Sequence, residues 1–95
     1  MMHPLDVQAL CEQSGPDDVL ANLSIDLIPF MESGDISDTG VIGTVVIETF
    51  DPLLNEVAKF FNISFDEIVG RFMGHADFTW DCYMAMKLKK QNRLH

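Results

Sequence analysis

The residues that come closest to a chemical site lie in one segment near the C-terminus, His75-Ala-Asp77-Phe-Thr-Trp-Asp81-Cys82. On a helix, His75 and Cys82 would lie two turns apart on one side with Asp81 near, as in half of a metal site or in a cysteine–histidine pair. The segment has no second cysteine and no second histidine at helical spacing, and Cys82 falls on an apolar face. We therefore expect Cys82 to pack, and we expect neither a metal site nor a catalytic group here.

No other part of the sequence carries a pattern typical of catalysis or cation binding. Glu32, Asp35 and Asp38 share one loop-like stretch, but their spacing departs from the alternating oxygen ligands of a calcium loop. There is no phosphate-binding Gly-x-x-x-x-Gly-Lys, no Gly-x-Ser-x-Gly elbow and no dinucleotide fingerprint. We expect a protein that is not an enzyme and that uses no cofactor.

Charge is divided unevenly along the chain. Residues 1–58 contain eleven carboxylates and no Lys or Arg, whereas residues 59–95 contain six basic residues against four acidic ones. The net charge of −9 argues against ordinary binding to phosphate backbones, for which cations supply the affinity. It favours a basic partner protein, or a surface that competes with nucleic acid for such a partner. The plainer interpretation is that the carboxylates only keep the chain soluble.

The composition indicates one folded domain, residues 1–95. Apolar residues make up 47% of the chain, which is typical of a folded protein and not of a disordered one. No stretch reaches the roughly 20 apolar residues that a membrane span needs, and the N-terminus lacks a secretory pattern. Two cysteines form no disulfide framework, so we expect reduced thiols and a cytoplasmic location.

Proline, glycine and helical spacing place two helices in the first third of the chain. Pro4 is suited to open a short helix, and Ser14-Gly15-Pro16 ends it and starts another. Apolar residues keep helical spacing through this second helix as far as Met31. We expect Pro29 to kink or shorten its end, and Gly34 to follow its C-terminus.

The segment from Val41 to Phe50 is open to two interpretations. Its β-branched residues favour a strand, whereas its apolar residues continue into Leu53, Leu54 and Val57 along one helical stripe. We favour a helix that is bent or broken at Asp51-Pro52, with Asp51 capping a new turn. A strand would change the fold class from all-α to α+β.

Two helices are expected in the last third of the chain. Ser64-Phe-Asp-Glu67 is a capping box, and it opens a short helix that we expect to end at Gly74. A final helix should run from about Asp77 to Asn92, with its late lysines near the negative end of the helix dipole.

Residues 52–70 carry a pattern with a known counterpart. They resemble the closing helices of lambda-repressor-like helix-turn-helix domains, in which this portion is structural and does not read DNA. The DNA-reading segment of that family would lie upstream, where this sequence has no Arg or Lys. The resemblance therefore implies a shared helical corner without repressor activity. The matching residues are Leu54, Val57, Ala58, Phe61, Asn62, Ile63, Ser64, Asp66, Glu67 and Ile68.

The final helix carries more apolar surface than one core-facing stripe requires. Trp, Tyr and Met are also enriched at protein interfaces. One interpretation is that a small domain buries this helix deeply; the other is that a second face meets another chain, as a homodimer or with a partner. The expected interface residues are Phe78, Trp80, Tyr83, Met84, Lys87 and Leu88.

The sequence thus predicts an all-α fold, a small bundle of four or five helices. The function that it favours is a non-enzymatic interaction module that docks a larger partner, basic or nucleic-acid-binding, as compact acidic inhibitors from phages and mobile elements do by mimicking nucleic acid. Its partner-binding carboxylates would be Asp17, Asp18, Asp26, Glu32, Asp35 and Asp38. The alternative is a helix-turn-helix-like DNA-binding regulator with phosphate contacts from Arg71, Lys87, Lys89, Lys90 and Arg93.

Overall fold

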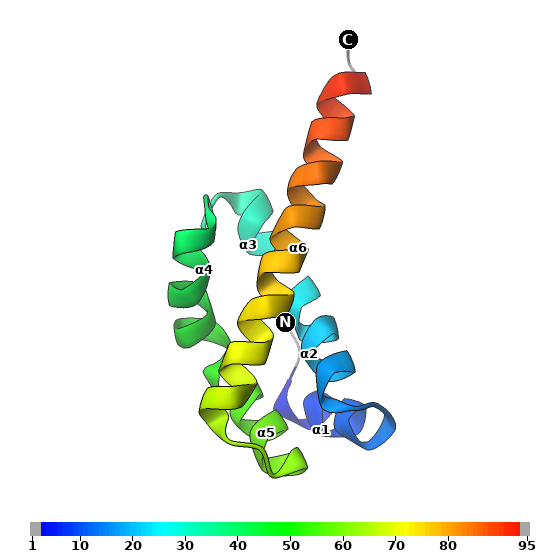
Figure 1. Cartoon of the computed structure of the whole chain (residues 1–95), viewed down its shortest axis with the longest axis vertical. Coiled ribbons are helices and arrows are strands. Elements are labelled where there is room, and N and C mark those ends of the chain that lie inside the picture. The colour runs from blue at the N-terminus through cyan, green and yellow to red at the C-terminus, as the bar shows by residue number, and fades with distance from the viewer. Residues whose placement is uncertain (1–2, 94–95) are drawn as a thin grey trace.

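The computed structural model describes the backbone of residues 3–93 and the side chains of residues 3–90. Within that range the chain is all-α and has no strand, which confirms the expected fold class (Figure 1). Its elements fall into four helical segments, the second and third of which are interrupted. They are α1 (Pro4–Gln13), α2 (Pro16–Ile25) with α3 (Ile28–Ser33), α4 (Thr39–Val45) with the π-turn η1 (Val46–Phe50) and α5 (Asp51–Phe61), and α6 (Phe65–Arg93).

The first two helices begin at the residues that the sequence indicates, and α3 ends where the end of the second helix was expected. Pro4, Pro16 and Pro29 all lie in first turns, where a missing N–H costs nothing. The kink expected near Pro29 appears as the break between α2 and α3. Gly34 ends α3 in the left-handed conformation, with φ of 88°, which glycine adopts without steric cost.

The segment from Val41 to Phe50 is helical, as its apolar spacing favoured. The chain does not break at Asp51-Pro52, however, and the expected cap by Asp51 is wrong. Asp51 is already helical, and Phe50 precedes it with no side-chain cap. Pro52 has no N–H to donate to the preceding turn, and the wider π-turn η1 lies just where that hydrogen bond would be missing.

Helix α6 is a single helix of 29 residues, so the expected end at Gly74 is wrong. Gly74 is helical because helical neighbours on both sides supply the hydrogen bonds, and a glycine within a helix costs only about 1 kcal/mol. One half of the expected capping box is present at the start of α6, where Glu67 N–H donates to Ser64 Oγ at 3.2 Å. The Glu67 carboxylate accepts instead from Arg71, at 3.0 Å.

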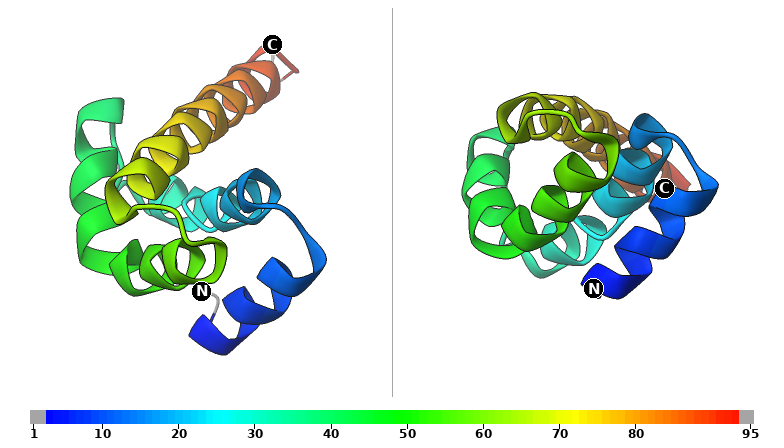
Figure 2. Two further views of the ribbon diagram at one scale, coloured as in Figure 1. Left: turned by 60° about the horizontal axis from the view of Figure 1, so that its bottom comes forward. Right: turned by 90° about the horizontal axis from the view of Figure 1, so that it is seen from below.

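The core lies between α6 and the ring of shorter helices, which Figure 2 shows from below. α2 packs mainly on α6, and α1 packs on α5. Phe50 and Phe72 meet at its centre, with ring centroids 5.5 Å apart. The molecule is elongated, 50 × 25 × 20 Å, because the C-terminal turns of α6 project beyond the other helices (Figure 1).

Candidate functional site

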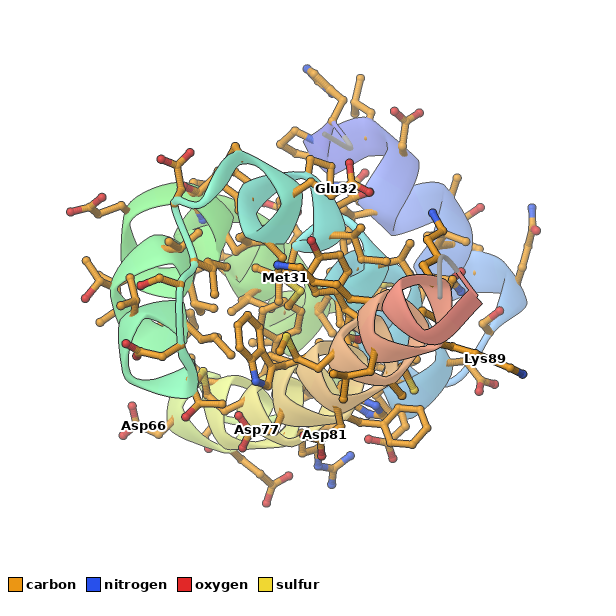
Figure 3. The ribbon with its side chains drawn as sticks, turned by 90° about the horizontal axis from the view of Figure 1, so that it is seen from above. Met31, Glu32, Asp66, Asp77, Asp81 and Lys89 are labelled. Atoms are coloured by element: carbon orange, nitrogen blue, oxygen red, sulfur yellow. The ribbon has the colours of Figure 1, made fainter. Side chains whose placement is uncertain are left out.

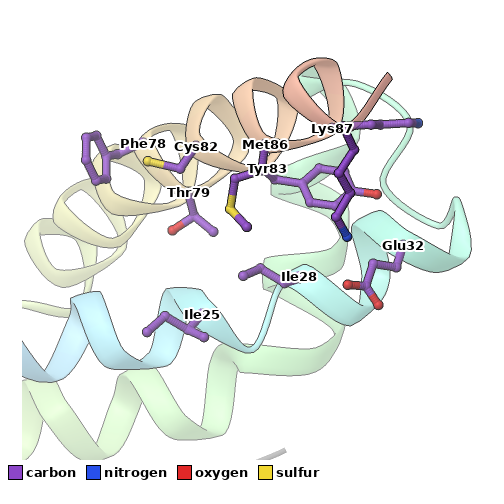
Figure 4. Close-up of a pocket in the computed structure, with 10 residues that line it drawn as sticks. Ile25, Ile28, Glu32, Phe78, Thr79, Cys82, Tyr83, Met86 and Lys87 are labelled. Carbon is purple, nitrogen blue, oxygen red and sulfur yellow. The ribbon is translucent and has the colours of Figure 1, made fainter. Parts of the chain in front are cut away.

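A groove runs between the α2–α3 pair and the second half of α6, with a volume of about 550 Å³ (Figure 4). This is within the range of pockets that bind ligands or side chains of a partner. Its walls are mostly apolar, with charged groups near the end where α6 leaves the body. The lining residues are Ile25, Ile28, Glu32, Phe78, Thr79, Cys82, Tyr83, Met86, Lys87 and Lys90.

One hydrogen bond between two buried hydroxyl groups holds the walls of this groove in place. Ser24 on α2 and Thr79 on α6 are buried, and their hydroxyl oxygens lie 2.9 Å apart. Ser24 Oγ also donates to the carbonyl of Ala21 at 2.7 Å, so the hydroxyl of Thr79 is the donor between the helices. This bond joins α2 to α6 beside the groove.

The apolar groups of the groove are unusually exposed for their size. Phe78 is 69% exposed, Met86 is 63% exposed and Ile25 is 56% exposed. They lie together with the exposed Cys82 along facing elements (Figure 4). A contiguous apolar surface of this kind marks a site of contact with another molecule, whereas single exposed apolar residues need no explanation.

The predicted interface residues divide into three groups. Phe78, Tyr83 and Lys87 line the groove. Trp80 is half-buried and packs against the core, with its ring 6.3 Å from that of Tyr83, and Met84 is half-buried as well. Leu88 is 56% exposed on the projecting part of α6, outside the groove lining.

The sequence interpretation missed the opposite wall of the groove, Ile25 and Ile28. Ile25 falls outside the stripe that buries Leu20, Leu23 and Leu27 on the same segment. An apolar residue off the buried stripe of an amphipathic helix is the signal that could have found it.

The structure directs His75 and Cys82 to different neighbours. His75 points to α2, where its Nε2 lies 3.5 Å from Asp17 Oδ1. The expectation that Cys82 packs is wrong, because its side chain is exposed on the groove wall. Among the described residues, no three His, Cys, Asp or Glu side chains converge as metal ligands.

The other cysteine is the packed one. Cys11 is buried in the core, and this burial, together with the nearby Glu56 carboxylate, raises the pKa of its thiol above the usual value. A raised pKa keeps the thiol neutral and unreactive.

The six carboxylates predicted to bind a partner do not form one cluster. Asp17 and Asp18 lie at the start of α2, whereas Glu32 and the loop from Asp35 to Asp38 lie at the far end of α3 (Figure 1). Asp17 contacts Arg71 and His75, and Asp38 caps α4 by accepting from Gly40 N–H at 2.8 Å. Asp26 is half-buried, and only Glu32 lines the groove.

Charge is nevertheless separated in space. None of the carboxylates on α1–α5 is buried, and α1–α4 carry no Lys or Arg. In Figure 3 the labelled Asp66 on α6 points away from the body, whereas Glu32 on α3 lies beside the groove. The exposed Lys87, Lys89 and Lys90 sit together on the projecting end of α6. The molecule therefore has an acidic body and a basic arm.

The phosphate-binding set predicted for a DNA regulator is divided. Arg71 is engaged with Glu67 at 3.0 Å and with Asp17 at 3.8 Å. Lys87, Lys89 and Lys90 are exposed, and the side chain of Arg93 lies outside the described residues.

Comparison with protein-family models, with curated proteins and with solved structures gave no match to this chain. Over the part of the chain that the structure describes, no helix combines the length and the apolar character needed to cross a membrane.

Proposed function

We propose that this chain is a non-enzymatic protein-interaction module and that the groove between α2–α3 and α6 is its contact surface. The observation that carries the proposal is the exposure of Phe78, Met86 and Ile25 side by side along one groove. Burying a Phe or Met side chain contributes about 1.5–3 kcal/mol. A partner that covers these partly exposed groups would gain a favourable contribution from each, offset in part by the cost of association.

The acidic body adds a preference among partners. Exposed carboxylates on α1–α5 favour a partner with a basic surface and raise its rate of encounter at low salt. The chain would thus act as a small regulator or inhibitor that docks a larger basic protein, including one whose basic surface normally takes nucleic acid. The apolar groove supplies binding energy for contact with another chain, and the exposed carboxylates favour a basic partner over an acidic one.

The test is retrieval from a nuclease-treated lysate with three tagged forms: wild type, Met86→Glu and Leu5→Glu. Leu5 on α1 is 66% exposed and gives a matched control with the same change in charge. We expect a stoichiometric protein, or a second copy of the chain, to remain with wild type and with Leu5→Glu and to be lost with Met86→Glu. Equal recovery with all three forms, or no protein bound by any, would overturn the proposal.

A further inference from the structure

We propose that the occupant of the groove is a second copy of this chain, bound through antiparallel pairing of the two α6 helices about Cys82. The inference rests on the proposed function, because it names the occupant of the groove that the proposed function takes as a contact surface. A larger basic protein would then meet the exposed carboxylates outside the groove. The inference goes further in stating which residues of the two copies meet. Three independent features of α6 support it: an apolar stripe, a charge gradient and the position of α2 beside it.

The apolar stripe is complementary to itself. Phe78, Cys82 and Met86 follow one another at intervals of four, on one exposed side of α6. A two-fold axis at Cys82 places Phe78 of one copy against Met86 of the other, and repeats the same contact at the opposite end. Methionine sulfur and aromatic rings attract one another. Such an interface is isologous, the usual form of a homodimer.

The charge gradient along α6 selects the antiparallel direction. Asp77 and Asp81 precede the axis, and Lys87, Lys89 and Lys90 follow it. Parallel helices would place like charges side by side, which is unfavourable. Antiparallel helices place the acidic half of one copy along the basic half of the other. The net charge of −9 per chain would otherwise oppose self-association.

The same register brings each basic arm to the start of α2 in the other copy. Lys89 lies seven residues after Cys82, and His75 lies seven residues before it, so the two meet across the axis. His75 contacts Asp17 at 3.5 Å, which fixes the first turn of α2 at that level. Lys89 and Lys90 of one copy would therefore lie beside Asp17 and Asp18 of the other.

Pairing also covers the part of α6 that its own bundle leaves bare. The last turns of α6 project beyond the other helices (Figure 1), and Met86 and Leu88 on this half of α6 are both more than half exposed. Short helices without tertiary contacts are only marginally stable in water. A second copy supplies the missing contacts.

The test is sedimentation analysis of the purified full chain across micromolar concentrations, with single and paired variants. We expect wild type and Leu5→Glu to dimerise and Met86→Glu to dimerise at least about tenfold more weakly. Lys90→Glu and Asp18→Lys should each weaken the dimer by roughly three- to tenfold. The paired variant Asp18→Lys with Lys90→Glu should recover most of the affinity, because the charges are exchanged and not removed.

Three results would overturn the inference. They are a wild-type chain that stays monomeric, a dimer that Met86→Glu does not weaken, and a paired charge variant that recovers nothing. A monomeric wild type whose retrieved partner is nevertheless lost with Met86→Glu would remove the second copy as occupant and leave the proposed function in place. If neither self-association nor a retrieved partner depends on Met86, both proposals fail.

Discussion

The hydroxyl groups of Ser24 and Thr79 are the polar side chains buried between α2 and α6 in the described part of the chain. Thr79 donates to Ser24 across a distance of 2.9 Å. A buried donor without an acceptor costs about 1–3 kcal/mol, whereas removing both partners is far less harmful. This pair therefore fixes the position of the groove wall more specifically than apolar packing alone.

We predict that Ser24→Ala lowers the free energy of unfolding by about 1–2 kcal/mol, because the Thr79 hydroxyl loses its acceptor. The double variant Ser24→Ala with Thr79→Val should cost clearly less than the sum of the two single changes. Urea denaturation of all four forms measures this coupling. Strictly additive losses would show that the two hydroxyl groups do not interact.

The two cysteines should differ in reactivity because one is buried and the other is exposed. Burial raises the pKa of Cys11, so at pH 8 its thiolate fraction is smaller than that of an ordinary cysteine, and stability should fall as the pH rises above the usual value of about 9. In dilute protein we predict that Cys82 reacts with iodoacetamide at least about tenfold faster than Cys11. Peptide mass mapping over time gives both rates, and equal rates would contradict the burial of Cys11.

Residue types alone could predict part of the candidate site. The extra apolar surface of α6 identified Phe78 and Tyr83, together with Lys87 that flanks it. All three line the groove. The same signal could not exclude Trp80, whose burial depends on the distant helices that pack against it. Cys82 was expected to pack because it falls on an apolar face of the helix, and only the direction of α6 relative to α2 shows that this face lines the groove.

Among the helices, α6 shows where local sequence signals fall short. Caps and prolines predicted the starts of α1, α2 and α6 because each acts on neighbouring backbone groups. Gly74 resembled a residue that ends a helix, but the chain is helical on both sides of it and α6 continues through this position. The π-turn before Pro52 could not be predicted either. The sequence shows that Pro52 cannot donate a backbone hydrogen bond, but it does not show which helical geometry the preceding turn adopts.

Continuity of α6 leads to a prediction at Gly74. A Cβ added there meets no atom within 4 Å, and alanine loses less conformational entropy than glycine on entering a helix. Gly74→Ala should therefore raise the free energy of unfolding by about 0.5–1 kcal/mol. The measurement is thermal unfolding at one low protein concentration.

Gly34→Ala is the matched control for that change. Gly34 has φ of +88°, a conformation that costs a residue with a Cβ about 1–2 kcal/mol, so this variant should be destabilised. If Gly74→Ala also destabilised the protein, α6 would not be continuous through that position.

At the scale of the whole molecule, an acidic body and a basic projecting arm determine what the chain can bind. The exposed Lys87, Lys89 and Lys90 are the cations available for a phosphate backbone among the described residues of α6, since Arg71 is held by Asp17 and Glu67. Eleven carboxylates lie on the N-terminal 58 residues. They would repel a nucleic acid that approached the arm closely.

We therefore predict no binding to duplex DNA at micromolar protein and about 50 mM salt, where a phosphate-binding protein is strongly favoured. Fluorescence anisotropy with a labelled duplex makes the measurement, and Lys89→Glu with Lys90→Glu provides the comparison. Submicromolar binding that falls steeply with salt and disappears in this variant would favour the helix-turn-helix-like regulator instead.

The all-α class and the approximate number of helices followed from spacing, because an amphipathic stripe reports on the face that each helix buries. The shape of the molecule did not follow. Where α6 leaves the bundle, and hence which of its residues remain uncovered, is decided by the lengths of α2 and α3 on the opposite wall. The sequence likewise does not show which residues of α2 and α3 face α6 across the groove.

The central claim is that a second copy of the chain covers the groove and the projecting end of α6. Hydrogen exchange of the backbone amides of residues 84–90 tests it most directly, with wild type and Met86→Glu compared at one concentration at which sedimentation shows wild type dimeric and Met86→Glu monomeric. If the claim is right, these amides exchange at least about tenfold more slowly in wild type, because the covering chain holds the helix end closed. Equally fast exchange in both forms would show that the end of α6 stays uncovered, and would contradict the account.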